Sequence, residues 1–238
     1  NEAGSGKSYA GNQVIGFNFE AVTEGVSVES AATSEWVVDQ ISIDKNGLQR
    51  FGDTEDFFAN RYQAEIDATN SINLADGSQL TWGEWSSGDN GSFILSSGGE
   101  VIENVIPEFR YMIGQATAIM PTTGQATFTP SVGYMQNITG DISVNFLNRN
   151  VAINNLGFSL EQFQFSGLNG GATYSENGSG FFKGNYSSGI CAGCSAFSPA
   201  ASVFTGNFIG NEADGLLYST IMQTGEEGTK AGVHAFTR

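Results

Sequence analysis

Basic residues are scarce in this sequence, where nine lysines and arginines stand against 25 aspartates and glutamates, for a formal net charge of −16 over 238 residues. A surface of this sign repels phosphate, so nucleic acid is not an expected partner. No apolar run approaches the roughly 20 residues that a membrane-spanning helix needs, and no basic-then-apolar leader opens the chain. We therefore expect a soluble, acidic chain that does not span a membrane and is either mature or cut from a longer protein.

Histidine, cysteine and proline are also rare, with one, two and four copies. A single histidine argues against a Ser-His-Asp hydrolase, and no Gly-x-Ser-x-Gly motif stands in an α/β pattern. The many carboxylates could be paired on paper as a glycosidase acid and base, but a sequence gives no distance between them. A solvated acidic surface is the simpler interpretation. We expect no enzyme, and a hydrolase is the less favoured alternative.

Glycine and phenylalanine are abundant, with 32 and 18 copies. Apolar and polar residues alternate in residues 14–19, 142–146 and 204–208, which predicts strands with one face on a core and one face in water. Residues 75–78 and 169–171 combine Asn, Asp, Gly and Ser in the manner of turns. The sequence therefore predicts an all-β fold of antiparallel strands.

One segment departs from the strand pattern. In residues 54–64, Asp53 or Thr54 can cap a helix N-terminus. The residues that share one helical face are Phe57, Phe58, Arg61 and Tyr62. This predicts one short helix covering an end of the β structure. A soft boundary near residues 122–124 divides an irregular β-rich part, residues 1–121, from a regular part, residues 122–238. A single domain overall is the alternative.

The C-terminal half carries a more specific pattern. Residues 206–218 read Gly-Asn-Phe-Ile-Gly-Asn-Glu-Ala-Asp-Gly-Leu-Leu-Tyr, and residues 232–236 form an alternating strand of small and aromatic residues. This hairpin resembles the C-terminal barrel of the transferrin-binding protein B-like family, including the barrels fused behind FecR-type domains. Residues 82–85 and 111–114 resemble upstream patterns of those fused proteins. The resemblance implies a soluble antiparallel barrel of about eight strands within residues 122–238.

The hairpin has a physical interpretation of its own. Gly206 and Gly210 remove side chains where the penultimate strand must bend to close a barrel, and Gly215 ends the turn. The side chains expected to point inward together are Phe204, Phe208 and Leu217. These features are structural and report a fold rather than a function.

Four residues are candidates for ligand binding: Trp82, Trp85, Tyr111 and His234. In an extended segment we expect Trp82 and Trp85 to share a face and stack on a sugar or a partner residue, or else to be core. Secreted haem-capturing proteins occur among the relatives of this barrel, so His234 is a candidate axial ligand. A strand histidine satisfied by water or a carbonyl is the favoured interpretation. We expect no cofactor and no metal, with haem as the alternative.

Cys191 and Cys194 have the spacing of a redox dithiol or half a zinc site. No helix begins at the motif to lower a thiol pKa, and His234 is the only histidine for a zinc set. A structural disulfide formed in an oxidising compartment is the favoured interpretation, with free thiols and metal or redox chemistry as alternatives.

Together these patterns predict a non-catalytic binding module of a bacterial envelope protein. We expect it to be exported to the cell surface, the medium or the periplasm of a Gram-negative bacterium. A monomer with ligand contacts on loops at one barrel rim is expected, in iron, haem or host-protein capture. A structural or adhesion domain of a larger surface protein is the alternative. The ligand, protein or small molecule, is not identified by the sequence.

Overall fold

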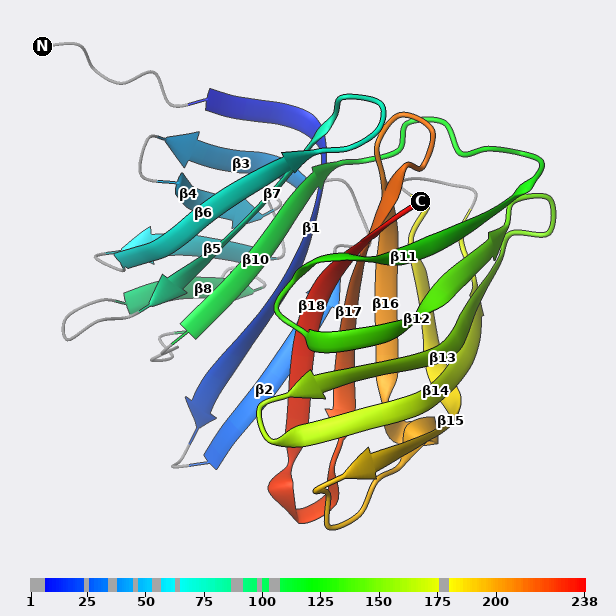
Figure 1. Cartoon of the computed structure of the whole chain (residues 1–238). Helices are drawn as coiled ribbons and strands as arrows, with labels where there is room; N and C mark the ends of the chain where they lie inside the picture. The colour runs from blue at the N-terminus through cyan, green and yellow to red at the C-terminus, as the bar shows by residue number, and fades with distance from the viewer. Residues whose placement is uncertain are drawn as a thin grey trace, which may run out of the picture.

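The computed structural model describes residues 7–23, 26–33, 38–44, 47–52, 57–62, 65–86, 92–97, 100–102, 108–175 and 180–238. These residues form two β structures packed side by side (Figure 1). No helix in these ranges is long and apolar enough to cross a bilayer.

The N-terminal strands form one ten-stranded sheet, in the order β6-β7-β10-β1-β3-β4-β5-β8-β9 with β2 paired to β1. Its strands are β1 (Lys7–Thr23), β2 (Val26–Thr33), β3 (Val38–Asp44), β4 (Gly47–Gly52), β5 (Phe57–Tyr62), β6 (Glu65–Asn73), β7 (Gln79–Ser86), β8 (Ser92–Ser97), β9 (Glu100–Ile102) and β10 (Glu108–Gln115). The first half of β1 pairs with β3, and its second half pairs with β10 on one edge and with β2 on the other.

The remaining strands close into an antiparallel barrel in sequence order, which confirms the predicted fold class. They are β11 (Gln125–Gly133), β12 (Gln136–Asn145), β13 (Asn150–Leu160), β14 (Phe163–Thr173), β15 (Phe182–Ala192), β16 (Val203–Ile209), β17 (Gly215–Gln223) and β18 (Thr229–Thr237). Short 3-10 turns, η1 (Pro199–Ala201) and η2 (Gly225–Glu227), precede β16 and β18. The β11 strand closes the barrel because it pairs with β12 and then with β18.

The helix predicted over residues 54–64 is wrong where the structure describes it. Residues 57–62 form β5, which pairs with β4 and β8, for example Arg50 with Asn60 and Phe58 with Ser96. The apolar spacing in this short segment satisfies a helical face as well as a strand, and strand partners distant in sequence decide between them. Residues 53–56 and 63–64 lie outside the described residues.

Large apolar side chains fill the barrel interior. Phe128, Phe182, Phe204 and Phe208 are buried together, and Phe208 also contacts the rings of Phe146 and Tyr174. Phe204 and Phe208 thus point inward as predicted, but Leu217 does not, because it belongs to a second cluster outside the barrel wall. Along β17 the alternation places Leu216 and Tyr218 inside, so the prediction was displaced by one residue.

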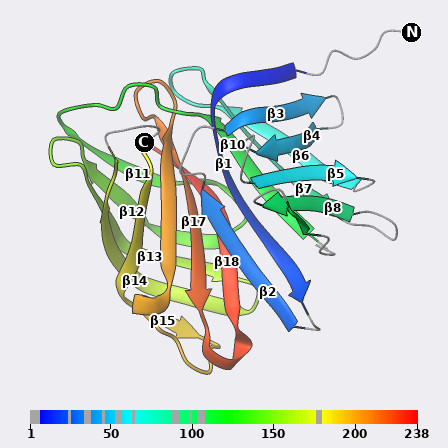
Figure 2. The same cartoon turned by 180° about the vertical axis from the view of Figure 1, so that it is seen from behind.

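The second cluster joins the sheet to the outside of the barrel. Leu217, Val233 and Ile209 of the barrel wall pack with Met112 and Val14 of the sheet. Glycines allow the close approach: a Cβ added at Gly16 would lie 2.9 Å from Val233 Cγ2, and one at Gly114 would lie 2.8 Å from Ile209 Cγ2. Figure 2 shows β1 and β2 beside β17 and β18.

A charged group adds to this junction. Lys230 of β18 donates to the carboxylate of Glu29 in β2 at 2.5 Å and lies 3.0 Å from that of Glu161. The Ala231 N–H also donates to Glu29, and the Glu29 carbonyl accepts from Thr229. Burial raises the pKa of the Glu29 carboxyl, and the bonds from Lys230 and Ala231 oppose that rise. The sheet is therefore tied to the barrel by specific polar contacts as well as by apolar packing.

Candidate functional site

Three of the aromatic residues predicted from the sequence lie in or beside buried clusters. Trp85 and Tyr111 are fully buried and in ring contact at 5.6 Å, and Trp85 also stacks on Phe109 at 5.2 Å. Trp82 lies on the other side of the sheet, partly buried against the sheet–barrel cluster. Residues three apart in a strand face opposite sides, so the expectation that Trp82 and Trp85 share a face is wrong. In this conformation Trp85 and Tyr111 offer no surface to a ligand.

His234 lies in the barrel wall with its ring 5.7 Å from that of Phe236. It is 5% exposed, and its Nδ1 has no hydrogen-bond partner among the described residues. Burial lowers the pKa of His234 to about 4, which keeps the ring neutral at physiological pH. The carbonyl partner expected from the sequence is not found among these residues, and haem ligation by His234 stays a prediction. Inside the barrel, the buried Tyr186 hydroxyl group is hydrogen-bonded to the hydroxyl groups of Tyr218 and Thr220.

The three glycines singled out in the hairpin have separate structural roles. A Cβ at Gly206 would lie 2.1 Å from Cζ of Phe182, so this glycine makes room for a core ring. Gly210 has φ +86° and begins the turn after β16. Gly215 opens β17, where a Cβ would lie 3.1 Å from the Phe236 carbonyl.

Cys191 and Cys194 form a disulfide at the end of β15, with a Cα–Cα distance of 5.8 Å. The next residue, Ser195, donates to the Glu227 carboxylate from its hydroxyl group at 2.7 Å and from its backbone N–H at 3.1 Å. These hydrogen bonds lower the pKa of Glu227. The disulfide loop is thereby fastened to the β17–β18 turn, and this end of the barrel is closed by structural contacts.

The opposite end of the barrel is crossed by the segment that links the sheet to the barrel, residues 116–124, which we call the strap. Its start is fixed by two hydrogen bonds from Thr117. The Thr117 N–H donates to the Phe208 carbonyl at 3.2 Å, and the Thr117 hydroxyl group donates to the Gly210 carbonyl at 2.7 Å. Its end is fixed where the Gly124 carbonyl accepts from the Phe146 N–H at 3.0 Å. Between these points the strap passes over the end of the aromatic core.

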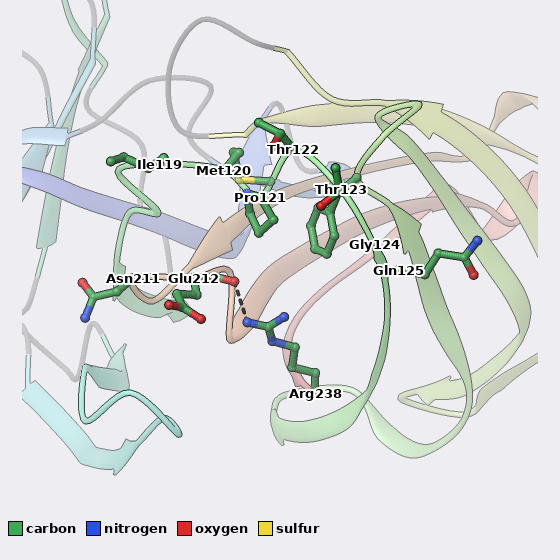
Figure 3. A pocket seen from close by; sticks show the side chains of 11 residues that line it. Ile119, Met120, Pro121, Thr122, Thr123, Gly124, Gln125, Asn211, Glu212 and Arg238 are labelled. Atoms are coloured by element: carbon green, nitrogen blue, oxygen red, sulfur yellow. Dashed lines mark hydrogen bonds between the residues drawn. The ribbon is translucent and has the colours of Figure 1, made fainter.

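A hollow of about 670 Å³ lies between the strap and the neighbouring turns. Figure 3 shows Met120 and Pro121 of the strap above Glu212 of the β16–β17 turn and Arg238, with the Ile119 side chain directed away from them. The remaining lining residues are Thr122, Thr123, Gly124, Gln125, Phe146 and Asn211. We call this end of the barrel, with Leu147 beside Phe146, the rim.

Exposed apolar side chains gather at the rim. Ile119 is 80% exposed and Leu147 is 68% exposed. One other large apolar side chain among the described residues is exposed to a similar degree, Ile190 of β15, at 69%. Arg238 donates from Nη2 to the Glu212 backbone carbonyl at 2.6 Å and lies 3.3 Å from the Asp214 carboxylate. The hollow thus has an apolar wall, a charged wall and an apolar floor at Phe146.

No protein-family model matches this chain, and no curated protein matches it in sequence. Solved structures do resemble it. A surface lipoprotein aligns with a TM-score of 0.44 and 11% identity over 94% of this chain and 98% of that one. A double mutant of the vaccine antigen transferrin-binding protein B from Haemophilus parasuis Hp5 aligns with a TM-score of 0.35 and 10% identity, over 96% of this chain and 75% of that one. Isotype 1 of transferrin-binding protein B from serogroup B Neisseria meningitidis aligns with a TM-score of 0.37 and 12% identity, over 94% of this chain and 43% of that one.

Structures of transferrin-binding protein B, the family that the C-terminal hairpin resembles, are thus among those that align with this chain. At identities near 11% and TM-scores below 0.5, these likenesses assign no ligand to this chain.

The rim residues were not among the sequence candidates. Ile119, Met120 and Pro121 directly precede the boundary drawn at residues 122–124, and Leu147 stands in a turn next to Asn148. Apolar residues inside turn and linker segments, away from any alternating run, were the available signal. Which of them remain exposed depends on how the strap crosses the barrel, and this is a tertiary property.

Proposed function

We propose that this chain is a non-catalytic, exported binding module that holds another protein at its barrel rim. The observation that carries the proposal is the contrast between the two places a barrel can bind. The interior is filled by buried aromatic side chains such as Phe204 and Phe208, whereas Ile119 at the hollow and Leu147 in the β12–β13 turn are exposed. Rigid strands that support exposed loops are a common arrangement for recognition.

A protein ligand fits this arrangement better than haem does. A haem group needs an apolar slot with an axial ligand, but His234 is buried in the barrel wall. The Gly133 backbone packs so closely on the His234 ring that a Cβ added at Gly133 would lie 2.6 Å from Nδ1. An exposed apolar patch bordered by polar groups is typical of protein–protein contact sites.

The absence of catalysis in this proposal rests on what the candidate groups already do. Glu29 and Glu227 are held by Lys230 and Ser195, respectively. His234 is neutral and buried. Catalytic acids and bases need a free approach to substrate, and these side chains serve structural contacts instead.

Export is supported by the disulfide between Cys191 and Cys194, because disulfides persist in oxidising compartments outside the cytoplasm. A cell-surface location is the form of export that gives a rim of this kind access to proteins in the surroundings.

The proposal is tested by placing a photo-crosslinking amino acid at Thr123, which is exposed on the rim, and in a matched variant at Ser188, which is exposed on the outside of the barrel. Each purified variant is irradiated in the native medium, and its adducts are identified by mass spectrometry. We expect one protein to be joined to the Thr123 variant and not to the Ser188 variant. Adducts of the same protein at both positions, or at neither, would contradict binding at the rim.

A further inference from the structure

We infer that the rim hollow accepts a bulky apolar side chain of a protein partner, and that a basic side chain next to it on the partner pairs with the Glu212 carboxylate. This inference rests on the proposed function, since it names the chemistry of the partner for the same site. It is carried by the shape and polarity of the hollow together with the charge of the chain.

The apolar part of the site is large enough for one or two side chains. The hollow measures about 670 Å³, with Phe146 buried at its base and Met120 and Pro121 partly buried in its wall. Ile119 stands outside on the strap, where a partner can cover it. Covering an exposed isoleucine removes apolar surface from water and so favours binding. An aromatic or branched apolar side chain on the partner gains most from this wall.

The charged part of the site has one carboxylate to spare. Arg238 binds the backbone carbonyl of Glu212, and its ion pair is with Asp214 rather than with the Glu212 side chain. Asp76, from the β6–β7 turn, accepts a bond from the neighbouring Asn211 N–H and adds negative charge at this place. Glu212 is exposed at the edge of the hollow, and the described residues give its carboxylate no cation. A lysine or arginine of a partner would supply that cation.

The net negative charge of the whole chain also favours a basic partner. At −16, the chain attracts basic proteins over distances set by the ionic strength and repels anionic lipid, nucleic acid and a second copy of itself. Steering of this kind raises the association rate more than the affinity, so binding should weaken as salt is added.

The experiment is an NMR titration of the full chain with a hexapeptide that has Phe-Leu at its centre and lysine on both sides. A peptide of the same centre flanked by glutamate is the matched control. We expect amide shifts at the strap, at Leu147 and at Glu212 with the lysine peptide at about 1 mM, and much weaker shifts with the glutamate peptide. Added salt should reduce the binding of the lysine peptide.

Three variants make the result specific. Ile119→Ser should weaken the lysine peptide about tenfold, whereas Ile190→Ser, which alters a similarly exposed isoleucine on the barrel wall, should not. Glu212→Gln should weaken binding and flatten its salt dependence, while the backbone carbonyl that holds Arg238 is kept. Equal binding of the two peptides, shifts centred on Ile190, or no shifts at all would overturn the inference. If the crosslink at Thr123 still forms in that case, the rim binds a protein of different chemistry and the proposed function stands.

Discussion

Replacing Gly206 by alanine tests the packing of the barrel core most directly. The added Cβ would lie 2.1 Å from Cζ and 2.7 Å from both Cε atoms of Phe182, whereas carbon atoms in favourable contact lie about 3.5–4.0 Å apart. The ring would have to move by about 1.5 Å. It cannot move freely, because Phe182 is buried and its ring lies 5.7 Å from that of Phe208 and 6.4 Å from that of Phe204.

Inserting a methyl group into a well-packed core costs about 1–3 kcal/mol. For a chain of this size 1 kcal/mol corresponds to roughly 2–4 °C, so Gly206→Ala should lower the melting temperature by about 2–12 °C. Thermal unfolding followed by circular dichroism at 218 nm, a wavelength that reports strands, would measure about this shift.

The matched control is Gly171→Ala in β14. Its Cβ would lie 3.6 Å from the nearest atom, the Val151 carbonyl oxygen, in ordinary contact and without a positive φ. This change should be neutral or stabilising by up to about 1 kcal/mol, because alanine restricts the unfolded chain. Phe182→Leu should restore part of the stability of Gly206→Ala. Equal melting temperatures of the two alanine variants, or no rescue by Phe182→Leu, would refute the argument that Gly206 exists to admit the Phe182 ring.

Three further predictions follow from other contacts. His234 has a folded-state pKa of about 4 against 6.5 in the unfolded chain, so the unfolded state binds the proton first and stability falls as pH drops through this window. The loss between pH 7 and pH 5 should be about 2 kcal/mol by urea unfolding, and it should be absent from His234→Gln; an identical slope in both proteins would contradict it. A double-mutant cycle of Glu29→Gln and Lys230→Met should give a coupling of about 1–3 kcal/mol, and a value of zero would show that the junction does not need the ion pair. Cys191 and Cys194 should resist alkylation without reductant, and replacing both by serine should cost about 2 kcal/mol, whereas labelling of both thiols in native protein would exclude the disulfide.

The alternation of apolar and polar residues predicted antiparallel strands, and the resemblance to the transferrin-binding protein B-like family supplied the barrel and its closing hairpin. Phe204 and Phe208 were placed inward correctly because they stand an even number of residues apart on one strand. Which face of β17 carries Leu217 depends on the register between β16 and β17, and the sequence does not specify this register. The residues of β17 that point inward are the neighbours of Leu217, Leu216 and Tyr218.

Two local signals were outweighed by tertiary contacts. The Asn-Gly-Gly sequence at 169–171 was predicted as a turn, but it lies inside β14. A Cβ at Gly170 would lie 2.9 Å from the Phe204 ring, so at this position glycine provides space for a side chain and not a change of direction. The β5 strand was mistaken for a helix for a related reason, since its partners in β4 and β8 come from elsewhere in the chain.

The candidate site was harder to predict than the fold. Trp82, Trp85 and Tyr111 attracted notice as aromatic residues, yet large aromatic side chains contribute most when buried, and two of these three are fully buried. The rim is assembled from the strap, two turns and Arg238, which are separated by as many as about 120 residues in the chain. No single stretch of sequence therefore carries its signature.

Most of the aromatic core lies away from the rim, and Phe146 is the buried core residue that the two share. The strap, the β12–β13 turn and the β16–β17 turn meet at the rim, where hydrogen bonds join the strap to both turns. Under the proposed function, insertions or substitutions at their tips would alter recognition while the aromatic interior and the junction with the sheet keep their packing. Such a barrel can acquire new specificities one loop at a time, and it offers a scaffold into which foreign loops can be grafted.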